Sequence, residues 1–150
     1  MFASTRLPAD PASAEASRRF VTVMLSDWPH DVIQVAALLT SELVTNAVVH
    51  ARSAAEVVLD HSDRALRVAV TDESSHLPIL VESMDLLIDH SRGLSMVSDM
   101  SDDWGVLTNG DSKTVWFNLR RPHRARRRFG RRQSSTVAMR AGERTDRIGD

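Results

Sequence analysis

Within an otherwise largely apolar stretch, residues 38–50, a carboxylate, a carboxamide and an imidazole follow one another at intervals of four residues. Glu42, Asn46 and His50 have the spacing i, i+4, i+8, which places their side chains in one stripe along a helix. The neighbouring residues are mostly apolar, so we expect this stripe to lie where the helix meets other structure. Buried polar groups cost free energy unless they are paired, and such a stripe therefore needs a ligand or an internal hydrogen-bond network.

The composition limits the classes of chemistry that the chain can perform. Its 150 residues, 42% of them hydrophobic, predict one soluble domain with a substantial core. The chain has no cysteine, which excludes disulfides, thiolate catalysis and metal sites built on cysteine. The N-terminus lacks the apolar run of a signal peptide, and no segment is expected to span a membrane. We therefore expect a cytoplasmic protein.

The net charge of -1 conceals two segments of opposite charge. Residues 1–119 carry eight basic and seventeen acidic side chains, a balance of -9, whereas residues 120–150 carry eleven arginines and three acidic side chains, a balance of +8. We interpret residues 1–119 as the folded domain and residues 120–150 as an Arg-rich, disordered tail. Nucleic-acid contact through this tail is the less favoured alternative, and its affinity would fall steeply with salt.

The pattern of apolar residues predicts an α/β fold. The expected elements are a strand over residues 5–7, helices over 12–28 and 31–51, strands over 55–60 and 65–72, a helix from 92, and strands over 104–107 and 113–119. Asn109-Gly110 is typical of a hairpin turn between the last two strands. The patternless stretch from residue 73 to about 91 has the length of a functional lid. This order of elements predicts a two-layer sandwich with helices on one face of a mostly antiparallel sheet.

Three motifs in this order resemble the GHKL ATPase superfamily, which includes gyrase and the histidine kinases. They are the segment from Glu42 to His50, Asp72 at a strand end, and Arg92-Gly93-Leu94. The most similar branch is that of the small bacterial anti-sigma-factor serine/threonine kinases, which end on a strand like that of residues 113–117. The resemblance covers approximately residues 6–119 and implies the Bergerat ATP-binding fold.

The resemblance implies a role for each residue of the helical stripe. Asn46 would supply its carbonyl oxygen to Mg²⁺ that bridges the phosphates of ATP, and Mg²⁺ prefers such hard oxygen ligands. Glu42 would orient or deprotonate the attacking hydroxyl, as catalytic base. His50 matches the family pattern as a nucleotide contact, and its alternative role is a favourable interaction with the helix dipole near the C-terminal end.

The resemblance also implies a base site and a phosphate turn. Asp72 would accept a hydrogen bond from the adenine amino group, and Thr114 would reach adenine through water. The turn formed by Arg92, Gly93 and Leu94 would hold the phosphates at a helix N-terminus. This chain lacks the glycines that usually follow the Asp, which removes backbone freedom near the nucleotide. We expect Lys113, the single lysine, to face solvent, and the five histidines other than His50 to lie at the surface.

The function implied is that of an ATP-dependent serine/threonine protein kinase. It would bind a sigma factor, phosphorylate an antagonist protein and form a homodimer, away from membranes. The alternative is a nucleotide-sensing or nucleotide-free module that binds partners without catalysis, and the missing glycines after Asp72 favour it.

Overall fold

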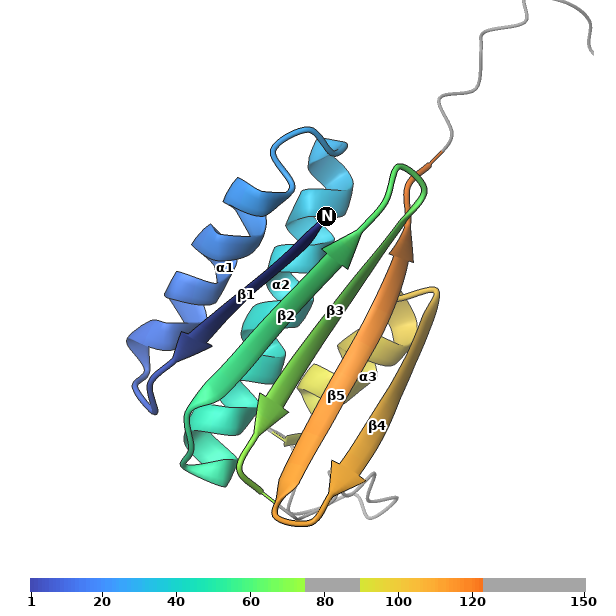
Figure 1. The fold of residues 1–150 in the computed structure, drawn as a ribbon. Coiled ribbons are helices and arrows are strands. Elements are labelled where there is room, and N and C mark those ends of the chain that lie inside the picture. The colour runs from blue at the N-terminus through green and yellow to red at the C-terminus, as the bar shows by residue number, and fades with distance from the viewer. Residues whose placement is uncertain (75–89, 123–150) are drawn as a thin grey trace, which may run out of the picture.

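The computed structural model describes residues 1–74 and 90–122, and within them three α-helices lie on one face of a five-stranded sheet (Figure 1). The sheet order is β1-β2-β3-β5-β4, and all neighbouring strands run antiparallel. The predicted two-layer α/β sandwich is confirmed. The elements are β1 (Phe2–Leu7), α1 (Ala12–Met24), α2 (His30–Asn46), the π-helical turn η1 (Ala47–Ala51), β2 (Ala55–His61), β3 (Ala65–Asp72), α3 (His90–Met100), β4 (Asp103–Asn109) and β5 (Ser112–Arg120).

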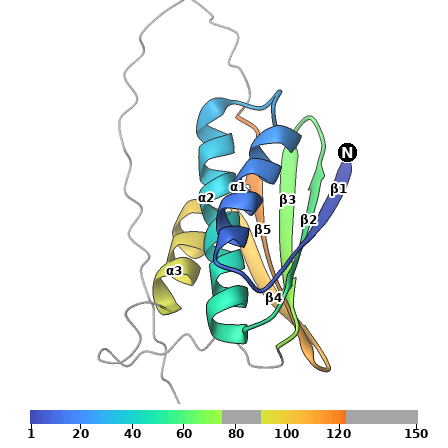
Figure 2. The same cartoon turned by 90° about the vertical axis from the view of Figure 1, so that its left-hand side faces the viewer.

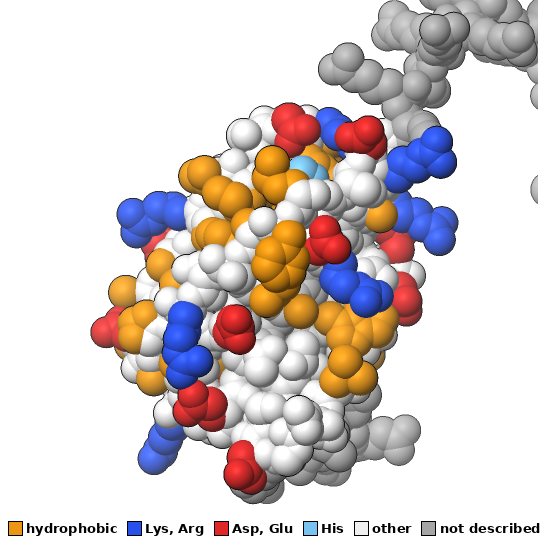
Figure 3. Space-filling view, viewed as in Figure 1, with side chains coloured by type: hydrophobic (Ala, Val, Ile, Leu, Met, Phe, Trp, Pro, Cys, Tyr) orange, Lys and Arg blue, Asp and Glu red, His pale blue; other side chains and the backbone are white. Residues whose placement is uncertain are grey.

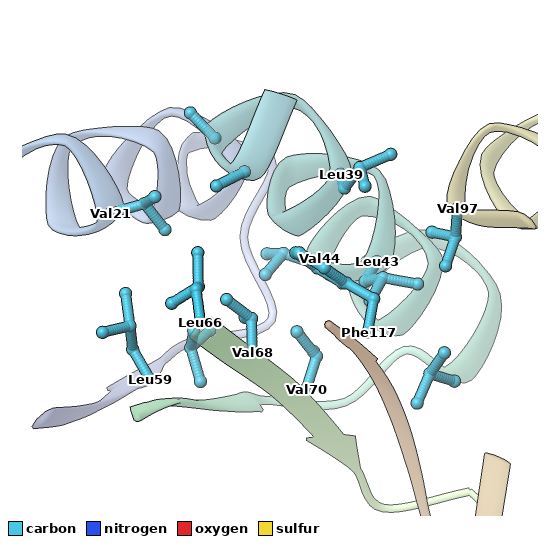
Figure 4. Close-up of a cluster of buried hydrophobic side chains, with 14 of the residues drawn as sticks. Val21, Leu39, Leu43, Val44, Leu59, Leu66, Val68, Val70, Val97 and Phe117 are labelled. Carbon is cyan, nitrogen blue, oxygen red and sulfur yellow. The ribbon is translucent and has the colours of Figure 1, made fainter. Parts of the chain in front are cut away.

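The core lies between the helices and the sheet, as the side view shows (Figure 2). Successive strand residues point to opposite faces, so every second residue of β3 and β5 enters this layer. Leu39 and Val44 of α2, Val68 of β3 and Phe117 of β5 are fully buried there and face one another (Figure 4). Their burial removes apolar area from water and holds α2 across the middle strands.

No helix of residues 1–74 and 90–122 lies on the other face of the sheet, where apolar and charged side chains are interspersed (Figure 3). The guanidinium of Arg67 lies over the ring of Trp116, 4.3 Å from its centre, and donates to Asn118 Oδ1 at 2.8 Å. Gly105 provides room for the other side of this ring, because a Cβ there would lie 2.7 Å from an indole carbon. The Arg67 side chain therefore covers the Trp116 ring on the open face.

The long central helix changes its pitch directly after Asn46. The predicted helix does continue to Ala51, but its last turn is a π-helix, in which hydrogen bonds span five residues instead of four. His50 lies in this turn and is exposed, whereas Glu42 and Asn46 are partly buried.

This helix also meets the length and apolarity of a membrane span, contrary to the expectation from sequence. Residues His30–Ala51 form 22 continuous helical residues, and half of the apolar window is buried inside the fold. The helix contacts α1, α3 and the two strands β3 and β5. This burial is typical of a core helix.

Several predicted boundaries differ from the structure. The first helix ends at Met24 rather than at residue 28, and β1 begins at Phe2 rather than at residue 5. In the last hairpin, Asn109 pairs with Ser112, so the two turn residues are Gly110 and Asp111. Gly110, at the first turn position, has a φ of 58°, which suits a glycine. Most of the predicted lid and the tail beyond Pro122 lie outside the described residues.

The prediction that His61 lies at the surface is wrong. Trp28 Nε1 donates to His61 Nδ1 at 3.3 Å, and the two rings meet edge to face at 5.8 Å. His61 Nε2 is buried without a hydrogen-bond partner. This contact joins the β2–β3 turn to the segment between α1 and α2.

Candidate functional site

Glu42 and Asn46 lie one turn apart on α2, at the contact between this helix and α3. Gly93, in the first turn of α3, lies directly against both side chains. A Cβ at Gly93 would be 3.3 Å from Asn46 Nδ2, 3.5 Å from Glu42 Cβ and 3.6 Å from Glu42 Oε2. The bare backbone of α3 therefore approaches a carboxylate and a carboxamide that are distant from it in sequence. Both side chains keep partial exposure to solvent, as a binding site requires.

We predict that Gly93→Ala weakens nucleotide binding about tenfold with little change in thermal stability. A 3.3 Å contact forces Asn46 to shift by a few tenths of an ångström, and small displacements of positioning groups have large effects on a preorganised site. Calorimetric titration with Mg·ATP, together with thermal unfolding, measures both quantities. Ser95→Ala, on the exposed side of α3, is the control. Unchanged affinity for the Gly93 variant would contradict the role of this close approach.

The other two residues of the predicted phosphate turn are Leu94 and Arg92. Leu94 is 3% exposed and belongs to the core, so its side chain fixes α3 rather than contacting a ligand. Arg92 belongs to the first turn of α3, but its side chain lies outside the described part of the chain. Backbone N–H groups of such a first turn have no partner within the helix and suit an anion.

Asp72, at the end of β3, is a buried carboxylate with a partner on each oxygen. Its Oδ1 accepts from the backbone N–H of Ser74 at 3.0 Å, and its Oδ2 lies 3.2 Å from Lys113 Nζ. The Asp72 and Lys113 side chains are 6% and 12% exposed. The prediction that Lys113 faces solvent is wrong. Lys113 pairs with Asp72 across β3 and β5, and it lies on the same face as the buried Phe117.

Thr114 lies on the opposite face of the sheet from Asp72. It pairs with Thr71 across β3 and β5, and the two hydroxyl oxygens are 2.7 Å apart. Since β-strand side chains alternate between faces, Thr114 points away from the helix layer. The structure therefore does not bring Thr114 together with Asp72, Glu42 or Asn46.

Sequence reasoning overlooked Ser53, which links the end of β3 to the loop after η1. Its hydroxyl accepts from the backbone N–H of Glu73 at 3.1 Å and donates to the carbonyl of Ala54 at 2.9 Å. This bridge holds the strand end that bears Asp72 beside the end of the helix that bears Asn46. A lone serine in a short loop gives no signal of such a contact.

Across residues 1–74 and 90–122, no three acidic or histidine side chains form a group able to hold a metal ion. A Mg²⁺ ion bound with a nucleotide does not require one, because it usually takes one or two protein oxygens and completes its shell with phosphates and water. The Asn46 carboxamide offers such an oxygen. The bare Gly93 backbone leaves space beside it that a Cβ would fill. The residues present therefore fit a Mg·nucleotide.

The model of the histidine kinase-like ATPase domain matches residues 7–119. The chain belongs to this family. The predicted membership of the GHKL superfamily is thereby confirmed, and the motif segments at α2, β3 and α3 all fall within the matched region.

Solved structures share the fold of this histidine kinase-like ATPase domain. One is the crystal structure of the RsbU and RsbW domains of Rv1364c from Mycobacterium tuberculosis, with a TM-score of 0.63 and 19% sequence identity. The match covers 81% of this chain and 33% of that chain, so this chain spans about a third of the other's length. No curated protein sequence matches the chain.

Proposed function

We propose that this domain binds Mg·ATP where α2, α3 and the end of β3 meet, and that it transfers the γ-phosphoryl group to a serine or threonine hydroxyl. The observation that carries the proposal is the contact of Gly93 with Glu42 and Asn46. It joins two of the three motifs that the superfamily uses. Membership of an ATPase family supports the nucleotide, and the neighbouring acid and amide support the transfer.

Each residue of the site has a role that its chemistry suits. Mg²⁺, when bound, neutralises charge on the phosphate oxygens, and the Asn46 oxygen holds it on α2. Glu42, one turn away, accepts the proton of the attacking hydroxyl and orients it, which is most of what phosphoryl transfer asks of a protein. The first-turn amides of α3 donate to phosphate oxygens. Asp72 accepts from the amino group of adenine at the other end of the nucleotide.

The macromolecular partners follow from the resemblance to the anti-sigma-factor kinases. In this proposal the domain acts in the cytoplasm as a homodimer, binds a sigma factor and phosphorylates an antagonist of that binding. The similarity to a structure containing an RsbW domain supports this branch. Co-elution of the purified chain with a panel of bacterial sigma factors, with and without Mg·ATP, tests the first partner.

Calorimetric titration with Mg·ATP tests the nucleotide site. We expect micromolar affinity, about 8 kcal/mol of binding free energy, and at least a roughly tenfold loss in Asp72→Asn. The Asn side chain offers one acceptor oxygen in place of two, and it removes the negative charge that pairs with Lys113 Nζ. Asp60→Asn, exposed on the open face of the sheet, is the matched control. Absence of binding at millimolar ATP would overturn the proposal.

A second candidate function is a module that binds its partner without nucleotide. Two observations favour it: both oxygens of Asp72 already have partners, and Ser74 stands where the superfamily usually has glycine. For this module, sigma-factor binding would be the same with and without Mg·ATP. If the domain is a kinase, Asn46→Ala instead abolishes phosphorylation of the antagonist and leaves partner binding intact.

A further inference from the structure

Asp72 and Lys113 form an ion pair at the point where β3 ends and β5 begins, and both side chains are almost entirely buried. Taking two charges out of water is costly, and apolar residues of similar size usually stabilise a fold as well or better. The chain places its single lysine here, among side chains of β5 that are otherwise apolar on this face. Stability alone therefore gives no reason for an ammonium at this position.

The pair lies at the same end of the molecule as Glu42 and Asn46. In Figure 1 the end of β3, the start of β5, the first turn of α3 and the η1 turn all lie at the lower end of the domain. η1 contacts β3, and Ser53 bridges the two through the Glu73 amide. The Lys113 ammonium therefore lies beside the Asp72 carboxylate at the end of the domain that also carries Asn46.

The two charged groups present a hydrogen-bond acceptor next to a donor. Asp72 Oδ1 is directed to the Ser74 amide, which leaves Oδ2, 3.2 Å from Lys113 Nζ, as the oxygen beside the ammonium. An ammonium carries three N–H donors, and a carboxylate oxygen accepts more than one hydrogen bond. The pair therefore presents an ammonium donor and a carboxylate acceptor side by side.

We propose that Asp72 and Lys113 act together to select adenine, with Asp72 accepting from the 6-amino group and Lys113 donating to ring nitrogen N1. This inference rests on the proposed function and adds a specificity-determining residue to it. Adenine carries a donor at position 6 beside an acceptor at N1. Guanine reverses both, with a carbonyl at position 6 and an N–H at N1. Asp72 would then face another acceptor and Lys113 another donor. Lys113 thereby takes the base contact that the sequence had suggested for Thr114.

The test is a cycle of two proteins and three nucleotides, measured by calorimetry in Mg²⁺. The natural chain and Lys113→Met are each titrated with ATP, with 1-deaza-ATP, which has C–H in place of N1, and with 7-deaza-ATP, which keeps N1. For the natural chain we expect 1-deaza-ATP to bind at least about tenfold more weakly than ATP, and 7-deaza-ATP to bind like ATP. For Lys113→Met we expect weaker ATP binding and no difference between ATP and 1-deaza-ATP.

The outcomes separate this inference from the proposed function. Equal affinity of the natural chain for ATP and 1-deaza-ATP overturns the role of Lys113, and so does ATP affinity in Lys113→Met that equals or exceeds that of the natural chain. The second result would show that the Lys113 ammonium occupies the position beside Asp72 that the adenine amino group would otherwise take. Failure of both proteins to bind any of the nucleotides overturns the ATP site itself. If Lys113→Met does not fold, the comparison of ATP with 1-deaza-ATP on the natural chain still tests the role of Lys113.

Discussion

We expect that replacing Glu42 with glutamine lowers phosphoryl transfer by about 10²- to 10⁴-fold and leaves Mg·ATP affinity within about threefold, because positioned general bases contribute on that order. Glutamine keeps the size of the side chain and its contact with Gly93, but it cannot take a proton. Single-turnover release of inorganic phosphate from ATP, with water as the acceptor, measures the rate without an identified protein substrate.

The matched control for this variant is Glu56→Gln. Glu56 is exposed in β2 on the open face of the sheet, paired in register with Arg6 and far from the helix layer. We expect its phosphate release to equal that of the natural chain. If Glu42→Gln were as fast as Glu56→Gln, Glu42 would not be the base, and the carboxylate beside Gly93 would have a structural role.

Replacing Asn46 with alanine reduces Mg·ATP affinity by about 10- to 100-fold, a loss typical of variants that disturb a metal site. The dependence of ATP affinity on Mg²⁺ tests this role more directly than the loss of affinity alone. In the natural chain we expect ATP to bind more tightly with Mg²⁺ than in EDTA, and in Asn46→Ala we expect this difference to disappear. Calorimetry in the two buffers gives both affinities.

Asn118→Ala is the control for the amide. Asn118 lies on the open face, where it accepts from Arg67, and its loss leaves the helix layer unchanged. We expect the natural affinity and the natural Mg²⁺ dependence. A persistent Mg²⁺ effect in Asn46→Ala would mean that the cation is held by other groups, and Asn46 would then act only in packing against α3.

Much of the fold was predictable because its signals are local. The alternation in residues 65–72 places Leu66, Val68 and Val70 on one face, and the structure buries all three. The helical spacing around Leu39 and Leu43 likewise identifies the buried side of α2. The turn chemistry of Gly110 marks the last hairpin, although the turn is one residue later than predicted, because Asn109 still pairs with Ser112.

The placement of Lys113 could have been predicted from the same alternation. Val115, Phe117 and Leu119 are apolar, and Lys113 shares their parity, so a strict period of two directs it inward. The same rule sends Thr114 to the other face. The resemblance to a family led to Thr114, whereas the physical pattern of the strand indicates Lys113.

Other features of the site could not be predicted from local pattern. The π-helical turn after Asn46, which contains His50, has no glycine or proline to mark it. The approach of Gly93 to Asn46 depends on how α3 crosses α2, which no spacing within either segment reports. Both are properties of tertiary packing.

The single lysine makes the chain unusual as a target of amine chemistry. Apart from the α-amino group of Met1, which donates to the carbonyl of His61, Lys113 carries the one primary amine of the 150 residues, and its side chain is 12% exposed. Acylating reagents, amine crosslinkers and enzymes that acetylate or ubiquitinate lysine therefore have one side-chain target in the entire chain. Any modification that removes the positive charge of Lys113 would abolish its ion pair with Asp72 at the end of β3.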